Sequence, residues 1–160
     1  MTRYALFAML AVGCGKEIGD SCVVQTDCDP NGTEGRICVD PNTNGGYCTV
    51  QGCDYNTCPS EAVCVQFFTG GYANKLCDPT VVTGGACTLD EICALDGHCV
   101  ARSSEIRYCM KTCSDQGDCR DGYECRGKDE MIKNGGQDVL APGDTIDDSS
   151  PKFCAPAPAS

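Results

Sequence analysis

The chain has 160 residues, a net charge of -11 and 17 cysteines. This acidic balance lacks the basic footprint of nucleic-acid and anionic-lipid binding, and it argues against both classes of partner. Beyond Cys14, Leu, Ile, Val and Phe total 23 of 146 residues, which would normally predict a disordered chain. Cysteine at about 11% instead indicates a disulfide scaffold in an exported protein.

Metal or redox chemistry is the other common use of many cysteines. Structural zinc sites, iron–sulfur clusters and thioredoxin-like centres usually bring two thiolates together through a C-x-x-C pair. No such pair occurs here, and Cys109 and Cys113 are the closest two cysteines. His98 is the only histidine, and nothing in the sequence places a nucleophile beside it. We therefore predict a protein that is not an enzyme and holds no metal or cofactor.

Residues 1–13, "MTRYALFAMLAVG", have the three-part layout of a secretory signal peptide. Arg3 is the basic residue, an apolar stretch runs from Ala5 to Val12, and the small residue Gly13 precedes Cys14. The apolar stretch is too short for a permanent transmembrane helix, which needs about twenty residues. The chain is therefore expected to be exported.

The end of this segment resembles the lipobox of bacterial lipoproteins, roughly Leu-(Ala/Ser)-(Gly/Ala)-Cys. Here it reads Ala11-Val12-Gly13-Cys14, with Leu10 one place earlier than usual. The resemblance implies that Cys14 carries diacylglycerol and starts the mature chain, with 14–18 as a tether to a membrane. Gly15 follows where Asp would signal inner-membrane retention, which favours the outer membrane, on its periplasmic or its cell-surface face. The alternative is ordinary cleavage after Gly13, with Cys14 left as a free thiol or paired between chains.

The other sixteen cysteines show an internal repeat. "GDSCVVQTDC" matches "GGACTLDEIC", "YCTVQGC" matches "YCMKTC", and "KLCDP" matches "KFCAP". These matches predict two eight-cysteine units, 19–80 and 84–157, each made of two four-cysteine modules. We expect all sixteen residues to form disulfides, in the quartets Cys22, Cys28, Cys38 and Cys48; Cys53, Cys58, Cys64 and Cys77; Cys87, Cys93, Cys99 and Cys109; Cys113, Cys119, Cys125 and Cys154.

Each quartet is predicted to be a small knot, with two cysteines on a loop and two on a hairpin. Short β-type runs surround the third and fourth cysteines, with turn-formers such as "PNTNGG" between them. The residue before the fourth cysteine is always large and apolar: Tyr47, Leu76, Tyr108 or Phe153. Four cysteines permit three connectivities, of which we favour first to third and second to fourth.

The predicted fold class is therefore a small disulfide-rich protein of short β-hairpins and loops, with little helix and a tandem repeat of four-cysteine knots. From "LAVGCG" through "IGDSC" and "DCRDGYEC" to "KFCAP", the chain resembles the predicted cysteine-rich lipoproteins of myxobacteria and their relatives. This group mostly lacks assigned activities. More distantly, the spacing of "CSDQGDCRDGYEC" resembles the cores of eukaryotic EB and Dickkopf modules.

The stretch "DCDPNGTEGRIC" is a candidate calcium loop, because Asp27, Asp29 and Asn31 precede Gly32. Cys38 occupies the place of the final bidentate Glu, so an Asx-turn leading into a hairpin is the favoured interpretation. Asn31-Gly32-Thr33 is also a glycosylation sequon, with little meaning in a bacterium.

Two loops are candidate contact surfaces. The segment 126–153 is far longer than its counterparts, and its composition predicts either a mobile loop or a binding loop. Its candidate contacts are Met131, Ile132, Val139 and Leu140. "QFFTGGY" places Phe67, Phe68 and Tyr72 near a hairpin tip, where alternation points one Phe inward and leaves the other free.

These observations favour a lipid-anchored, non-enzymatic binding or structural module of the cell envelope, outside the cytoplasm. One alternative is a protease inhibitor, because disulfide knots hold loops in a preorganised conformation. Its basic contact residue would be Arg102, Lys111 or Arg120. A second alternative is an adhesion or spacer protein of the envelope.

Overall fold

The computed structural model describes residues 15–40, 45–70, 75–81 and 85–158. The predicted signal peptide, the candidate lipid anchor Cys14 and Tyr72 lie outside the described residues. Within the described residues no helix is long and apolar enough to cross a membrane.

The architecture is mainly β, which confirms the predicted fold class. A five-stranded antiparallel sheet has the order β7-β9-β6-β3-β8, and two small two-stranded sheets flank it. Its strands are β3 (Ala62–Phe68), β6 (Glu105–Cys113), β7 (Tyr123–Arg126), β8 (Gln137–Asp138) and β9 (Lys152–Pro156). The small sheets pair β1 (Ile37–Val39) with β2 (Tyr47–Thr49), and β4 (Glu91–Cys93) with β5 (Cys99–Ala101). The helical elements are α1 (Gln25–Cys28), α2 (Lys128–Asn134) and the 3-10 turns η1 (Arg102–Ser104) and η2 (Gln116–Asp118).

The fourfold repeat is visible in the strand register. In four antiparallel pairs, two cysteines lie directly opposite each other across the ladder. These pairs are Cys38 and Cys48, Cys64 and Cys109, Cys93 and Cys99, and Cys125 and Cys154. Facing cysteines are not bonded to each other, because each bonds to a loop cysteine earlier in its repeat.

The eight disulfides define four modules with one connectivity, first to third and second to fourth. Module 1 contains Cys22–Cys38 and Cys28–Cys48. Module 2 contains Cys53–Cys64 and Cys58–Cys109. Module 3 contains Cys77–Cys93 and Cys87–Cys99. Module 4 contains Cys113–Cys125 and Cys119–Cys154.

The predicted membership of the two middle quartets is wrong. Cys109 belongs to module 2 and Cys77 to module 3, so module 3 is inserted between the third and fourth cysteines of module 2. The physical reason is the seven-residue pairing of β3 with β6, which places Cys109 opposite Cys64. The Cys58–Cys109 and Cys77–Cys93 bonds also cross the predicted boundary between 80 and 84, which corrects the division into two separate eight-cysteine units.

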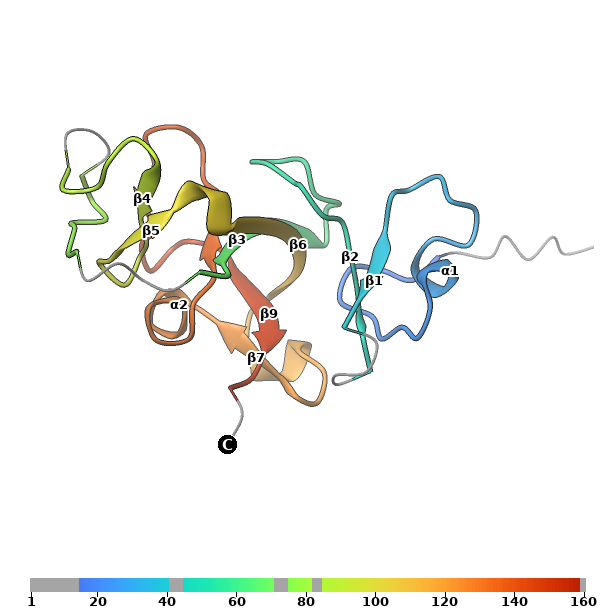
Figure 1. Cartoon of the computed structure of the whole chain (residues 1–160). Coiled ribbons are helices and arrows are strands. Elements are labelled where there is room, and N and C mark those ends of the chain that lie inside the picture. The colour runs from blue at the N-terminus through green and yellow to red at the C-terminus, as the bar shows by residue number, and fades with distance from the viewer. Residues whose placement is uncertain (1–14, 41–44, 71–74, 82–84, 159–160) are drawn as a thin grey trace, which may run out of the picture.

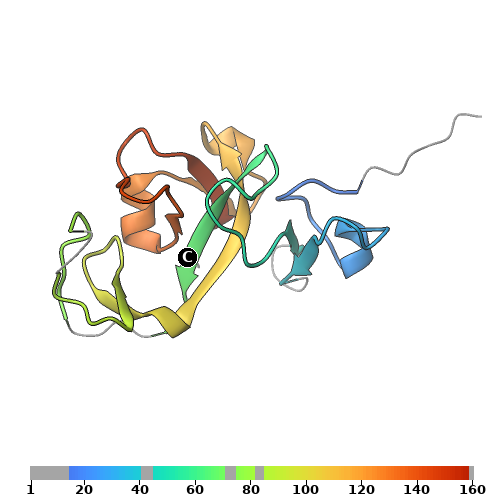
Figure 2. The same ribbon diagram turned by 90° about the horizontal axis from the view of Figure 1, so that it is seen from above.

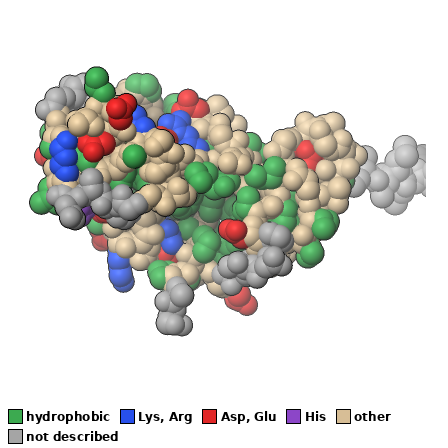
Figure 3. Space-filling view, in the orientation of Figure 1, with side chains coloured by type: hydrophobic (Ala, Val, Ile, Leu, Met, Phe, Trp, Pro, Cys, Tyr) green, Lys and Arg blue, Asp and Glu red, His purple; other side chains and the backbone are tan. Residues whose placement is uncertain are grey.

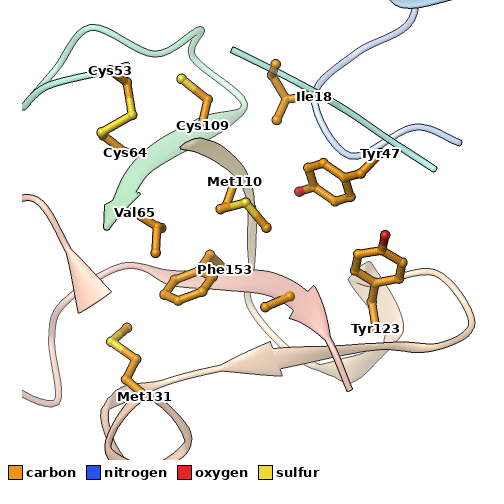
Figure 4. Packing of buried hydrophobic residues seen from close by; sticks show 11 residues of the cluster. Ile18, Tyr47, Cys53, Cys64, Val65, Cys109, Met110, Tyr123, Met131 and Phe153 are labelled. Carbon is orange, nitrogen blue, oxygen red and sulfur yellow. A yellow bond between two sulfur atoms is a disulfide. The ribbon is translucent and has the colours of Figure 1, made fainter. Parts of the chain in front are cut away.

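The main core lies on one face of the central sheet (Figure 4). Val65 of β3, Met110 of β6 and Phe153 of β9 meet there, and Met131 of α2 covers them. Alternation along β3 directs Val65 and Phe67 to this face, and the ring of Phe67 lies edge-on to Phe153 at 6.4 Å. The core is small, so the disulfides contribute much of the stability.

Module 1 is fixed to the rest of the molecule by buried polar contacts. The Thr49 hydroxyl donates to the carbonyl of Cys109 at 2.7 Å, and the amide of Lys111 donates to the Tyr47 hydroxyl at 2.8 Å. The Tyr47 and Tyr123 rings stack at 5.3 Å. These contacts join module 1 to modules 2 and 4.

The predicted tether 14–18 is largely part of the folded body. Ile18 is fully buried in the main core, and Arg36 donates to the carbonyl of Lys16 at 2.8 Å. Gly15 already lies against the backbone of Cys28. The described chain is therefore packed from its first residue onward.

The molecule is elongated, with module 1 and module 3 at opposite ends (Figures 1 and 2). The chain enters at the end formed by α1, β1 and β2. The hairpin of β4 and β5 lies at the far end in both views.

The long segment 126–153 is folded, which corrects the expectation of a mobile loop. It contains α2 and β8, Met131 is buried, and Val139 packs against the main core. Arg126 donates to the carbonyls of Asn134 and Gly135 at 3.0 and 2.8 Å, which fixes the end of α2.

Candidate binding surface

Disulfide formation accounts for the cysteine sulfurs that metal chemistry would need. Several groups of three metal-ligating residues lie within 4.8 Å of one another, and every cysteine in them is disulfide-bonded. A disulfide sulfur lacks the charge of a thiolate, which is the form that binds zinc. The clusters reflect neighbouring disulfides within each module.

The candidate calcium loop is organised by hydrogen bonds from its own backbone. The Asp29 carboxylate accepts amide hydrogens from Thr33, Glu34 and Gly35 at 2.9–3.0 Å. Burial raises the pKa of Asp29, but these hydrogen bonds outweigh it, and the pKa lies below its usual value. Asp27 instead accepts from the amides of Val23 and Val24, before α1. Asp29 thus closes a loop through amides four to six residues further along the chain, which is wider than the expected Asx-turn, whose bond reaches the amide two residues on.

The three basic candidates for protease contact differ in their surroundings. The Arg120 guanidinium lies 4.2 Å from the Tyr123 ring centroid and donates to the Tyr123 hydroxyl and the Gly46 carbonyl. Lys111 is half-buried within β6. Arg102 is exposed, and its Nε donates to the carbonyl of Leu89 at 3.1 Å. Of the three, Arg102 alone is placed for contact with a partner.

His98 lies in the turn region of module 3. Its Nδ1 is 3.4 Å from Asp96, and the following residue, Cys99, is bonded to Cys87. The His98 ring and the Asp96 carboxylate therefore lie side by side at the hairpin.

The aromatic pair Phe67 and Phe68 lies at the end of β3, and both rings are half-buried. Phe67 packs against Phe153 of the core and against Tyr108 at 6.4 Å. Phe67 therefore reaches from the core toward a surface groove.

This groove, called here the aromatic groove, has a volume of about 210 Å³ and lies where module 1 meets the central sheet. Figure 3 shows hydrophobic side chains gathered in the middle of the molecule. The groove is lined by Val39, Asp40, Tyr47, Thr49, Phe67, Tyr108, Met110, Tyr123 and Pro156. Four aromatic rings in one concave surface suit a flat apolar ring or an apolar side chain.

The polar groups of the aromatic groove are few and well defined. Among the described residues that line it, Asp40 is the one carboxylate and has a left-handed backbone, with φ of 47°. Burial raises the pKa of the Tyr47 and Tyr123 hydroxyls, so both stay neutral and uncharged. Arg120 stacks behind Tyr123 and holds that ring in place. An apolar ligand that carries a positive charge would match this arrangement.

Sequence reasoning identified only part of this surface. Tyr47 and Tyr108 appear as the large residue before a fourth cysteine, and Phe67 appears as a hairpin aromatic. Met110 and Tyr123 were not predicted as site residues from the sequence, although "YCM" and "GYEC" place each of them beside a cysteine of a hairpin. Their convergence depends on the contact of module 1 with modules 2 and 4.

Comparison with known proteins gives no relative. No family model, no curated protein and no solved structure matches the chain. The eight disulfides themselves indicate an oxidising, extracytoplasmic environment and a small disulfide-rich module.

Proposed function

We propose that the protein is a lipid-anchored, non-enzymatic binding module of the cell envelope, attached to the outer membrane through Cys14. The observation that carries this proposal is the complete pairing of the sixteen later cysteines. Since these form eight bonds among themselves, Cys14 has no disulfide partner left among them. Two or three acyl chains on this residue would give stable anchoring.

The elongated shape supports a role in which one end is held and the other is presented. Residue 15 packs at the module 1 end, so an acylated Cys14 would hold the body directly against the membrane. Module 3 would then point away from the surface. The aromatic groove lies between the two ends and is the concave apolar site that the binding role would use.

Metabolic labelling with a clickable palmitate analogue, in a bacterium that processes lipoproteins, tests this proposal. The wild-type chain should incorporate label and sediment with membranes, and Cys14→Ser should do neither. Cys53→Ser is the matched control, because it removes a disulfide cysteine and should keep the label. Incorporation that persists in Cys14→Ser would contradict the anchor.

A protease-inhibitor role is a second candidate, and the exposed Leu89 would be a contact residue beside Arg102. Leu89 is 95% exposed and lies two residues after Cys87. Its turn is braced by the amide of Thr88 donating to Glu91 at 2.8 Å and by Arg102 on the Leu89 carbonyl. Chymotrypsin-like and elastase-like enzymes, which accept apolar residues, and trypsin-like enzymes, which accept basic residues, are the appropriate panel. Absence of inhibition at micromolar concentration would remove this candidate.

A further inference from the structure

Asp138 is a buried carboxylate without a hydrogen-bond donor. The residue is 5% exposed, and neither carboxylate oxygen has a hydrogen-bond partner among the residues that the structure describes. It lies in β8 opposite Val65, a fully buried residue of β3. An ionised carboxylate in such a place loses its hydration without compensation, so the buried form must be the neutral acid.

The segment that carries Asp138 is held by few contacts. We call residues 135–151 the strap. Two residue pairs join β8 to β3, the amide of Val139 donates to the carbonyl of Cys64 at 2.9 Å, and Gln137 accepts from the amide of Leu95 at 2.8 Å. No cysteine occurs between Cys125 and Cys154, so the strap lies within the longest stretch of the disulfide-bonded region without a covalent cross-link.

The strap has a hinge at its start and fixed points outside it. Gly135 and Gly136 both adopt positive φ, which glycine adopts without strain. Before them, Arg126 fixes the end of α2, and beyond them Cys154 is bonded to Cys119. The strap could therefore move while α2 on one side and the Cys119–Cys154 disulfide on the other stay in place.

The charged groups around Asp138 cannot supply a counterion. Strand β3, "AVCVQFF", has no ionisable side chain apart from a disulfide-bonded cysteine. The cleft of about 400 Å³ beside Asp138 has Tyr55 and Asp144 as its titratable groups, and neither is a cation. On α2, the Glu130 carboxylate accepts from the amide of Gly127, and neither Lys128 nor Lys133 contributes to the pKa of Asp138. Burial alone raises the pKa of Asp138 to about 7, without any contribution from a neighbouring charge.

We propose that Asp138 makes the strap a proton-dependent latch, docked on β3 when the carboxyl is protonated and released when it ionises. Release would uncover the edge of β3 and part of the main core, against which Val139 and Ile146 pack. An uncovered strand edge can pair with an extended segment of a partner. Proton concentration outside the cytoplasm would then control access to this edge. The latch does not depend on lipid attachment at Cys14.

The direction of the effect follows from linkage. The docked carboxyl binds its proton more tightly than the released one, whose pKa is 3.8, so release becomes easier as pH rises from about 4 to 7. Above pH 7 both states are ionised and the effect levels off. Between pH 5 and pH 8 the released fraction should rise about 100-fold.

Amide hydrogen exchange of the full chain, corrected for intrinsic rates, tests the latch. Protection of residues 137–146 should fall about 100-fold between pH 5 and pH 8, while protection of the β3–β6 ladder stays constant. Asp138→Asn should abolish the pH dependence, and Asp144→Asn, an exposed acid in the same strap, should keep it. Unchanged strap protection in the wild type, or pH dependence that persists in Asp138→Asn, would overturn the proposal.

Carboxyl carbon NMR of the wild-type protein is a second test, and it does not require that any substituted protein folds. The side-chain carboxyl of Asp138 should titrate with a midpoint near 7, together with the loss of strap protection. A midpoint near 4 would overturn the latch.

Discussion

Modules 2 and 4 each carry a long insert at the same place, between the third and fourth cysteines, but the two inserts are held differently. Module 3, inserted in module 2, has two disulfides of its own. The insert of module 4, residues 126–153, has none and depends on packing and hydrogen bonds. Two facing cysteines and their loop partners thus form a frame that tolerates very different loops between the third and fourth cysteines. Loss of a disulfide should therefore loosen module 3, whereas loss of packing or of a hydrogen bond should loosen residues 126–153.

Removal of the frame disulfide of module 2 should have the largest effect. Cys58–Cys109 closes 51 residues, and replacing both cysteines with Ser should cost about 4 kcal/mol of global stability. The matched pair Cys77→Ser and Cys93→Ser should lower protection within module 3 only. Urea unfolding followed by circular dichroism, with hydrogen exchange, measures both. Equal global losses for the two double variants would contradict the distinction between frame and insert.

The insert of module 4 should depend on packing. Met131 is 2% exposed, and Met131→Ala should destabilise α2 and the strap by about 3 kcal/mol through lost burial and a cavity. The adjacent Ile132 is 41% exposed, and Ile132→Ala should cost less than about 1 kcal/mol. Hydrogen exchange of residues 128–146 reports the difference. A similar loss for both variants would show that the packing of α2 is not as described.

Substitution of two neighbouring glycines at the hinge of the strap distinguishes the cost of backbone strain from the cost of a steric clash. A Cβ on Gly136 would lie 2.8 Å from the Phe67 ring, whereas a Cβ on Gly135 meets nothing within 4 Å, and both residues have positive φ. Gly136→Ala should therefore cost about 2 kcal/mol more than Gly135→Ala, which bears only the backbone term. Thermal unfolding of the two variants measures this gap. Equal melting temperatures would refute the close contact with Phe67.

Excision of module 3 should have the smallest effect on the remaining fold. The amide of Thr69 donates to the carbonyl of Ser104 at 2.9 Å, so the two ends of the insert are already adjacent. Replacing residues 70–103 by Asn-Gly, a two-residue hairpin turn, should leave six disulfides and change stability by about 1 kcal/mol. The mass under non-reducing conditions and the protection of β3 and β6 are the readouts. Failure of the shortened chain to form six disulfides would show that module 3 is needed by the frame.

The sequence predicted the fold class, the fourfold knot and its connectivity, but it assigned two cysteines to the wrong knots. "YCTVQGC" and "YCMKTC" correctly mark the passage from a fourth cysteine to the first of the next module. "KLCDP" misled, because it resembles "KFCAP" while Cys77 opens module 3. Leu76, the residue before it, is 70% exposed, unlike the buried Tyr47 and Phe153.

The aromatic groove and the latch could not be predicted from the sequence, since both depend on contacts between modules. Tyr47 and Tyr123 stack only because module 1 packs on module 4. Asp138 is one acid in an acidic segment, and its burial follows from the pairing of β8 with β3. Spacing shows which cysteines share a hairpin, but it carries no information about which side chains meet across two hairpins.

Disulfide mapping of the oxidised protein tests the nested arrangement most directly. Cleavage at Lys75, Asp78, Asp90, Asp96, Arg102 and Lys111 places Cys77, Cys87, Cys93, Cys99 and Cys109 on separate peptides, and mass spectrometry without reduction then identifies the linked peptides. Nesting of module 3 within module 2 predicts peptides joined through Cys58–Cys109 and Cys77–Cys93. Peptides joined through Cys58–Cys77 and Cys93–Cys109 would contradict it and restore four knots in simple tandem.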